Sequence, residues 1–245
     1  MKTLFCQLII TILFVVSLQA GDTRLGSLTR DEITEIQKQL KAYERGAMTV
    51  EDLTEDKDRG FKLIAYYLSN SNAVTTKMKL PISRCFVASG KYAEAAELAG
   101  DYVGVYSNDW HGWKLLGAAN GRLGNFDQAL RAVTNAVNLG DEGSLGPLAY
   151  VSLKLKRFDL FEKYIPRLLI LKRSKPTQDV NPLDIVTVLV VYSLKADKQD
   201  MFIKALDGVD AGDVLSRKDL TFAVREGCER FKAKETESLC QKIAK

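Results

Sequence analysis

The chain has 245 residues, of which 46% are hydrophobic and 27% are charged, as in an ordinary globular protein. Its net charge of +4 is too close to neutral to indicate a nucleic-acid-binding protein, because phosphate binding needs a concentrated basic stripe. The length suffices for a sizeable core, in one elongated array or in two domains.

Residues 1–20 have the layout of a secretory signal peptide. Lys2 precedes the almost wholly apolar run Leu4–Leu18, and the segment ends on the small residue Ala20. The apolar run is about 15 residues long, shorter than the ~20 residues that a membrane-spanning helix needs. We therefore predict cleavage after Ala20, a periplasmic or otherwise secreted protein, and a linker over 21–28. The alternative is an uncleaved segment that anchors the chain in a membrane, since no later stretch is apolar enough to span one.

The next segment, 29–75, is predicted to form a pair of helices. Thr29 with Glu32 fits a capping box, and the helix that it opens runs to Arg45, with Gly46 as the stop. A second helix follows, with apolar residues at helical spacing: Phe61, Ala65 and Leu68.

The most regular pattern in the chain lies between Trp113 and Leu139. It reads W-x2-LG-x2-N-x2-LGNF-x2-A-x6-A, with small residues such as Gly117, Ala129 and Ala136 where two antiparallel helices would touch. This pattern resembles one tetratricopeptide repeat (TPR), a 34-residue helix–turn–helix unit. The resemblance implies that Trp113 packs between helices.

Related patterns flank this unit on both sides. The upstream pattern lies 34 residues earlier and is carried by Ile82, Phe86, Gly90, Tyr92 and Ala95. The downstream pattern lies 32 residues later and is carried by Leu148, Ser152, Phe158 and Phe161. A weaker fourth pattern follows after 41 more residues, at Leu189, Ser193 and Phe202. We predict TPR-like repeats over 76–171, an inserted loop over 172–182 and degenerate helix pairs over 183–245.

No convincing alternating run indicates a strand, and the Val- and Ile-rich stretch Ile185–Val191 has a helical period. The predicted fold is therefore all-α. The resemblance to the repeat family implies a right-handed α-solenoid of about six antiparallel helix pairs. Phe161 replaces the usual alanine, which predicts a looser helix crossing in the third unit.

In the TPR family the first helices of successive pairs line a concave groove that binds peptides. Carried over to this chain, the groove positions that bear polar or aromatic side chains are Lys77, Arg84, His111, Lys114, Arg122, Tyr150 and Lys154. Trp110 begins its helix and is a further candidate contact, because tryptophan is a common interface anchor. From Lys79 to Leu155 the first helices hold a single acidic residue, Asp109. A basic groove favours an acidic partner segment, with arginines binding carboxylates in a bidentate manner; the alternative is a solvated face on which long cations cover apolar neighbours.

The sequence gives little support to enzymatic chemistry. His111 is the only histidine, and the chain has no glycine-rich phosphate loop and no G-x-S-x-G motif. Cys85 lies beside Phe86 in a predicted packed helix, where we expect a buried structural thiol. We therefore predict no catalytic residue, no cofactor and no metal site.

Cys228 and Cys240 leave two alternatives open. If the chain turns near Lys232–Glu235, the two cysteines stand level on antiparallel helices and form a disulfide. If the helix is continuous, twelve residues separate them by about 18 Å and no bond forms.

The leading functional hypothesis is a non-enzymatic protein–protein interaction scaffold, which binds another protein or peptide and no nucleic acid. A second hypothesis is a structural subunit of a cell-envelope assembly, for which exposed apolar residues near Phe222, Phe231 and Leu239 would be the signature. An enzyme comes third, and its signature would be a deep polar pocket containing His111.

Overall fold

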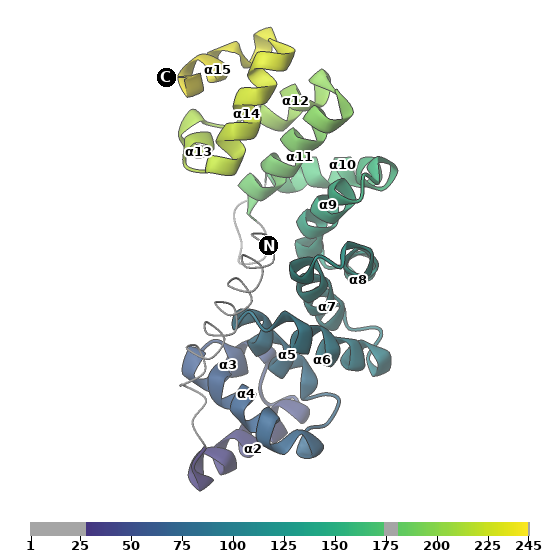
Figure 1. The fold of residues 1–245 in the computed structure, drawn as a ribbon, viewed down its shortest axis with the longest axis vertical. Helices are drawn as coiled ribbons and strands as arrows, with labels where there is room; N and C mark the ends of the chain where they lie inside the picture. Colours follow the sequence, from purple (N-terminus) through teal and green to yellow (C-terminus); the bar gives the residue numbers. More distant parts are fainter. Residues whose placement is uncertain (1–27, 174–180, 245) are drawn as a thin grey trace, which may run out of the picture. The chain divides into compact units, whose positions relative to one another are not determined.

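The computed structural model describes residues 28–173 and 181–244. Within these ranges the chain forms fourteen α-helices and three short 3-10 helices, with no strand, so the predicted all-α class is confirmed (Figure 1). The predicted signal peptide, nearly all of the linker and most of the inserted loop lie outside the described residues. The chain divides into two compact units after Ser107. This division falls inside the segment 76–171 that was predicted as one array of repeats.

Unit 1 contains five α-helices. They are α2 (Arg30–Glu44), α3 (Val50–Thr54), α4 (Lys57–Asn70), α5 (Lys79–Ala88) and α6 (Tyr92–Val105).

The first helix begins and ends as predicted. The Thr29 hydroxyl accepts a hydrogen bond from the Glu32 amide, and the Glu32 carboxylate accepts one from the Thr29 amide at 2.9 Å. Gly46 follows the helix end with a φ of 75°, in the left-handed region that glycine favours. The prediction of a single helix pair over 29–75 was wrong, because a second capping box, Thr49 with Asp52, starts the extra helix α3.

The core of unit 1 receives buried side chains from all five of its helices. Its largest fully buried side chains include Leu53, Leu63, Ile64, Ile82 and Phe86. The hairpin of α5 and α6 is also joined by a buried hydrogen bond, in which the Ser83 hydroxyl donates to the Ala95 carbonyl at 2.9 Å.

Unit 2 contains three helical hairpins followed by a C-terminal group. Its helices are α7 (Trp110–Leu123), α8 (Phe126–Asn138), α9 (Leu145–Lys154), α10 (Phe158–Lys172), α11 (Pro182–Ala196), α12 (Gln199–Leu206), α13 (Ala211–Leu215), α14 (Lys218–Phe231) and α15 (Glu237–Ala244).

The small residues of the central pattern lie where α7 meets α8. A Cβ atom on Gly117 would come within 2.6 Å of the Val133 Cγ1 atom, and Ala129 and Ala136 are fully buried. Trp113 is only partly buried, although a core position was predicted for it.

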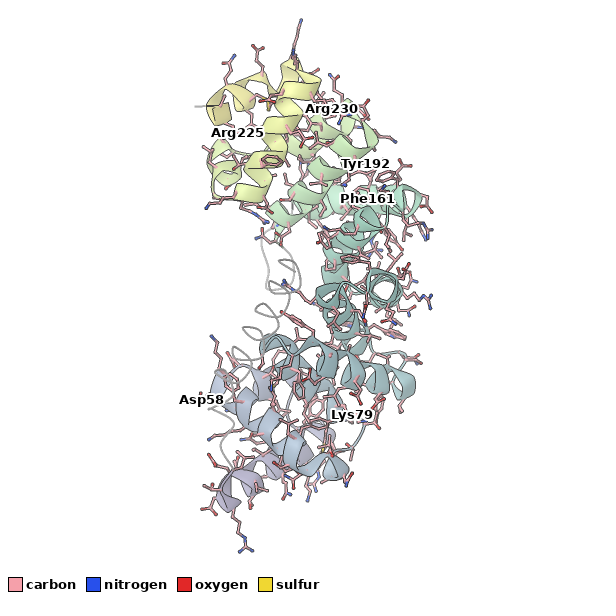
Figure 2. All side chains as sticks on the ribbon, viewed as in Figure 1. Asp58, Lys79, Phe161, Tyr192, Arg225 and Arg230 are labelled. Atoms are coloured by element: carbon pink, nitrogen blue, oxygen red, sulfur yellow. A yellow bond between two sulfur atoms is a disulfide. The ribbon has the colours of Figure 1, made fainter. Side chains whose placement is uncertain are left out.

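Aromatic packing joins the second hairpin of unit 2 to the third. The buried rings of Phe161 and Tyr192 stack at a centroid distance of 4.4 Å, where α10 meets α11 (Figure 2). The Tyr192 hydroxyl donates to the Glu162 carboxylate at 2.5 Å, and the Lys198 ammonium lies 2.8 Å from the same oxygen. The bulky Phe161 thus fills the helix contact at which the repeat pattern has alanine.

The chain turns after α14 and does not continue as one helix. Lys232 has a φ of 49°, and α15 begins at Glu237 after a short 3-10 turn. Cys228 and Cys240 form a disulfide between α14 and α15. The Arg225 guanidinium also donates to the Ile243 carbonyl at 2.8 and 3.1 Å. Across the described residues, no helix combines the length and hydropathy that crossing a membrane requires.

Candidate functional site

Two of the predicted binding residues belong to unit 1, and both contact neighbouring helices. The Lys77 ammonium donates to the Glu44 carbonyl at the end of α2 at 2.6 Å. The Arg84 guanidinium pairs with the Glu51 carboxylate of α3 at 2.5 Å. These cations therefore hold α2 and α3 against the rest of unit 1.

A second group of predicted residues gathers at the start of α7. The Trp110 and His111 rings stack at a centroid distance of 3.5 Å, and His111 Nδ1 lies 2.7 Å from the Asp109 carboxylate. The Lys114 ammonium lies 5.3 Å from the Trp110 ring and 3.8 Å from the Asp141 carboxylate. This group is a local cluster, and none of its members lines the groove described next.

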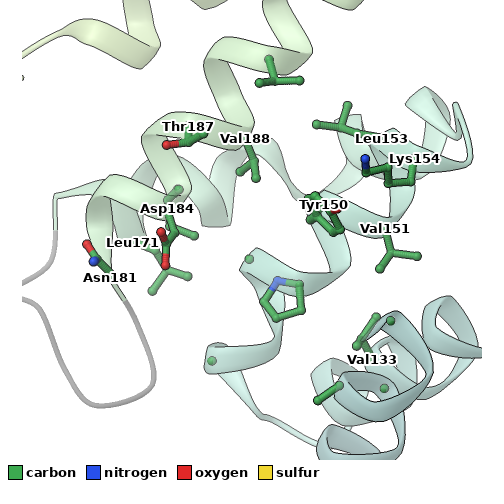
Figure 3. A pocket seen from close by; sticks show the side chains of 18 of the residues that line it. Val133, Tyr150, Val151, Leu153, Lys154, Leu171, Asn181, Asp184, Thr187 and Val188 are labelled. Atoms are coloured by element: carbon green, nitrogen blue, oxygen red, sulfur yellow. The ribbon is translucent and has the colours of Figure 1, made fainter. Parts of the chain in front are cut away.

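A groove in unit 2 brings several of the predicted residues together. It has a volume of about 940 Å³ and runs along α7, α9 and α11, with the start of α14 at one edge. Figure 3 shows Tyr150 and Lys154 on one side and Asp184, Thr187 and Val188 on the other. Of the predicted residues, Arg122, Tyr150 and Lys154 line this groove.

The helical period explains which residues face the groove. On α11 they recur every three or four positions, from Asp184 through Val188 and Val191 to Lys195. The apolar residues of α11, including Ile185, form the floor together with residues from α8 and α9: Val133, Val151 and Leu153. Tyr150 stands above this floor with 46% of its surface exposed.

The groove also contains acidic residues, which corrects the prediction of a basic groove without acids. Glu142 comes from the 3-10 turn before α9, Asp184 from α11 and Asp219 from α14. The prediction considered only the first helices of the three repeats, α5, α7 and α9, and the acidic residues lie on other elements.

Each groove acid is paired with an arginine. Arg167 lies 2.5 Å from the Glu142 carboxylate, and Arg217 bonds both Asp184 and Asp219. The hydrogen bond from Arg217 lowers the pKa of Asp219 below its usual range. The three acids are therefore paired within the protein, although the two arginines offset only two of their three charges.

Three exposed cations in the groove have no carboxylate partner among the described residues: Arg122, Lys154 and Lys195. The Lys154 ammonium lies 5.3 Å from the Tyr150 ring, a cation–π contact that leaves its hydrogen-bond donors available. Lys195 was not predicted as a groove residue, although the repeat spacing indicates it. Lys154 lies 32 residues after Arg122, and Lys195 lies 41 residues after Lys154, which are the spacings that relate the repeats.

The arrangement can hold a ligand that has both apolar and acidic side chains. An apolar floor removes apolar side chains of a ligand from water, and unpaired cations at the edge can hold its carboxylates. Comparison with models of protein families and with curated proteins finds no match to this chain.

Proposed function

We propose that the chain is a non-enzymatic protein–protein interaction scaffold of TPR-like, right-handed α-solenoid architecture. In this proposal the groove of unit 2 binds a segment of another protein. Three consecutive hairpins support the architecture, because their first helices, α7, α9 and α11, line one common groove.

The observation that carries the proposal is the combination of an apolar floor with unpaired cations at its edge. The groove is open in the free chain, so a ligand segment does not need to order it on binding. Burial of apolar side chains then contributes affinity, while Arg122, Lys154 and Lys195 select against segments that carry cations.

We also propose that the chain is exported by a signal peptide cleaved after Ala20, to the periplasm or the secretory space. The disulfide between Cys228 and Cys240 supports this, because such bonds persist mainly in oxidising compartments. Retention in a membrane by an uncleaved N-terminal segment is the alternative.

A structural subunit of a cell-envelope assembly is the second candidate. Phe222 favours it, because 73% of its surface is exposed on α14. Phe231 and Leu239, which were predicted to accompany it, are partly buried against the core. A single exposed ring is a smaller apolar surface than a permanent interface requires, so we rank the groove first.

The test is a steric block of the groove. Ala118 is exposed and lines the groove, so Ala118→Trp fills it without disturbing the core. The matched control is Ala93→Trp, at an exposed alanine on α6 of unit 1. Peptides selected from a displayed library on the full chain should lose at least about tenfold in affinity for A118W and bind A93W unchanged. If the selected peptides bound A118W and A93W equally well, the binding site would lie outside this groove.

A further inference from the structure

The three unpaired cations occupy one structural position in three consecutive hairpins. Arg122, Lys154 and Lys195 lie in the last turns of α7, α9 and α11, respectively. Because α8 and α10 each return between two of these helices, the three first helices run in the same direction. Their C-terminal ends therefore share one rim of the groove, which we call the cationic rim (Arg122, Lys154 and Lys195).

The opposite rim has the opposite character. Glu142 precedes α9, Asp184 lies in the first turn of α11 and Asp219 in the first turn of α14. Two arginines, Arg167 and Arg217, pair with these three acids and leave this rim with one net negative charge. The groove is thus polarised across its width, with an apolar floor between a cationic rim and a weakly acidic one.

A place in the last turn is what the helix dipole favours, and α10, α12 and α14 also end with a basic residue. Those three cations have partners within the chain: Lys172 donates to backbone carbonyls, and Lys204 and Arg230 pair with aspartates. The cations that end α7, α9 and α11 differ, because all three face the same groove and lack an acidic partner among the described residues. A row of cations without acidic partners in the chain can pair with the carboxylates of a ligand.

We infer that the cationic rim recognises an extended peptide that carries carboxylates along one edge, about three or four residues apart. The inference rests on the proposed function and adds the chemistry and spacing of the ligand. The helices α9 and α11 pack against each other. Packed helices lie about 8–10 Å apart, and an extended chain advances about 3.3 Å per residue, so Lys154 and Lys195 meet ligand residues three or four positions apart. Arg122 continues the row on α7. Apolar side chains between the carboxylates point toward the floor.

An extended peptide suits the groove better than a nucleic acid. A nucleic acid would bring phosphates close to Glu142, Asp184 and Asp219, and the floor offers it a single exposed aromatic ring, Tyr150.

The experiment compares fluorescein-labelled peptides of equal composition on the full chain by fluorescence polarisation. One peptide carries three glutamates separated by two apolar or neutral residues each, and its isomer carries the three glutamates in a block. We expect the spaced peptide to bind about tenfold more tightly than the isomer, with a steep loss of affinity in salt.

Substitutions in the cationic rim test the same contacts from the protein side. Binding of the spaced peptide should weaken about three- to tenfold in each of the variants Arg122→Gln, Lys154→Gln and Lys195→Gln. The control, Arg131→Gln on the exposed face of α8, should bind as the wild type does.

A double-mutant cycle tests the register. Replacing the central glutamate of the peptide by glutamine should weaken binding to the wild type and cause no further loss with K154Q.

Two results together would overturn the rim inference: equal binding of the two isomers, and unchanged binding to all three rim variants. The A118W variant would still test whether the groove is the binding site. A labelled oligothymidylate that bound more tightly than the spaced peptide, through the same rim residues, would also overturn it. If A118W bound the spaced peptide as the wild type does, the groove itself would be the wrong site.

Discussion

At the scale of single residues, two helical glycines have opposite roles. A Cβ atom on Gly227 would come within 2.1 Å of the Phe202 ring, which is fully buried. A Cβ atom on Gly100, in α6, would meet nothing within 4 Å. The first glycine is therefore required by packing, and the second is not.

Alanine substitutions at these glycines should change stability in opposite directions. Gly227→Ala should lower the free energy of unfolding by about 1–3 kcal/mol, because overpacking outweighs the gain in helix propensity. Gly100→Ala should raise it by about 0.5–1 kcal/mol, since it restricts the unfolded chain without strain. Urea denaturation followed by circular dichroism measures both. A stabilised G227A would show that the ring of Phe202 can move.

The capping box of α2 makes the stability of the folded chain depend on pH. The hydrogen bond from the Thr29 backbone, with a smaller contribution from Lys62, lowers the pKa of Glu32 from 4.5 to about 2. Between these values the unfolded chain binds more protons than the folded one, so stability falls as the pH drops from about 4.5 to 2. Glu32→Gln should flatten this part of the acid-unfolding profile, while Glu97→Gln, at an exposed glutamate of α6, should leave it unchanged. Identical profiles for the wild type and E32Q would contradict the assignment.

At the scale of elements, the sequence predicted helices well where the signal was local. The capping box at Thr29 and the small residues at Gly117, Ala129 and Ala136 act over a few residues, and the structure has them in the predicted contacts. The short helix α3 was missed, because five residues are too few to show a hydrophobic period. The groove acids were missed for another reason: Asp219 reaches the groove because α14 folds back on α11, a contact that no local spacing encodes.

The last hairpin depends on its disulfide. The bond between Cys228 and Cys240 closes a short loop across α14 and α15, worth about 2–3 kcal/mol in the chain-entropy picture. We expect reductant to lower the unfolding midpoint of the wild type and to have no effect on the Cys228→Ser, Cys240→Ser double variant. Cys85 does not complicate the experiment, because burial raises the pKa of its thiol to about 12 and keeps it unreactive in the folded chain. A reductant effect of the same size in the double variant would count against this role of the disulfide.

At the scale of the whole molecule, the division after Ser107 separates two cores. The core of unit 1 is built from its five helices, while that of unit 2 extends from Val133 to Ile243. Compact units with their own cores generally open as separate cooperative units.

Local destabilisation should therefore stay within one unit. G227A lies in α14, so it should raise amide hydrogen exchange in peptides from α11 to α15 and leave α2 to α6 unchanged, because substitutions in separate cores act independently. G100A provides the reciprocal control, with slower exchange confined to unit 1. Hydrogen exchange read by mass spectrometry resolves the two sets of peptides. Equal acceleration in α2 to α6 by G227A would mean that the two cores unfold as one, and the groove of unit 2 would then depend on the stability of the entire chain.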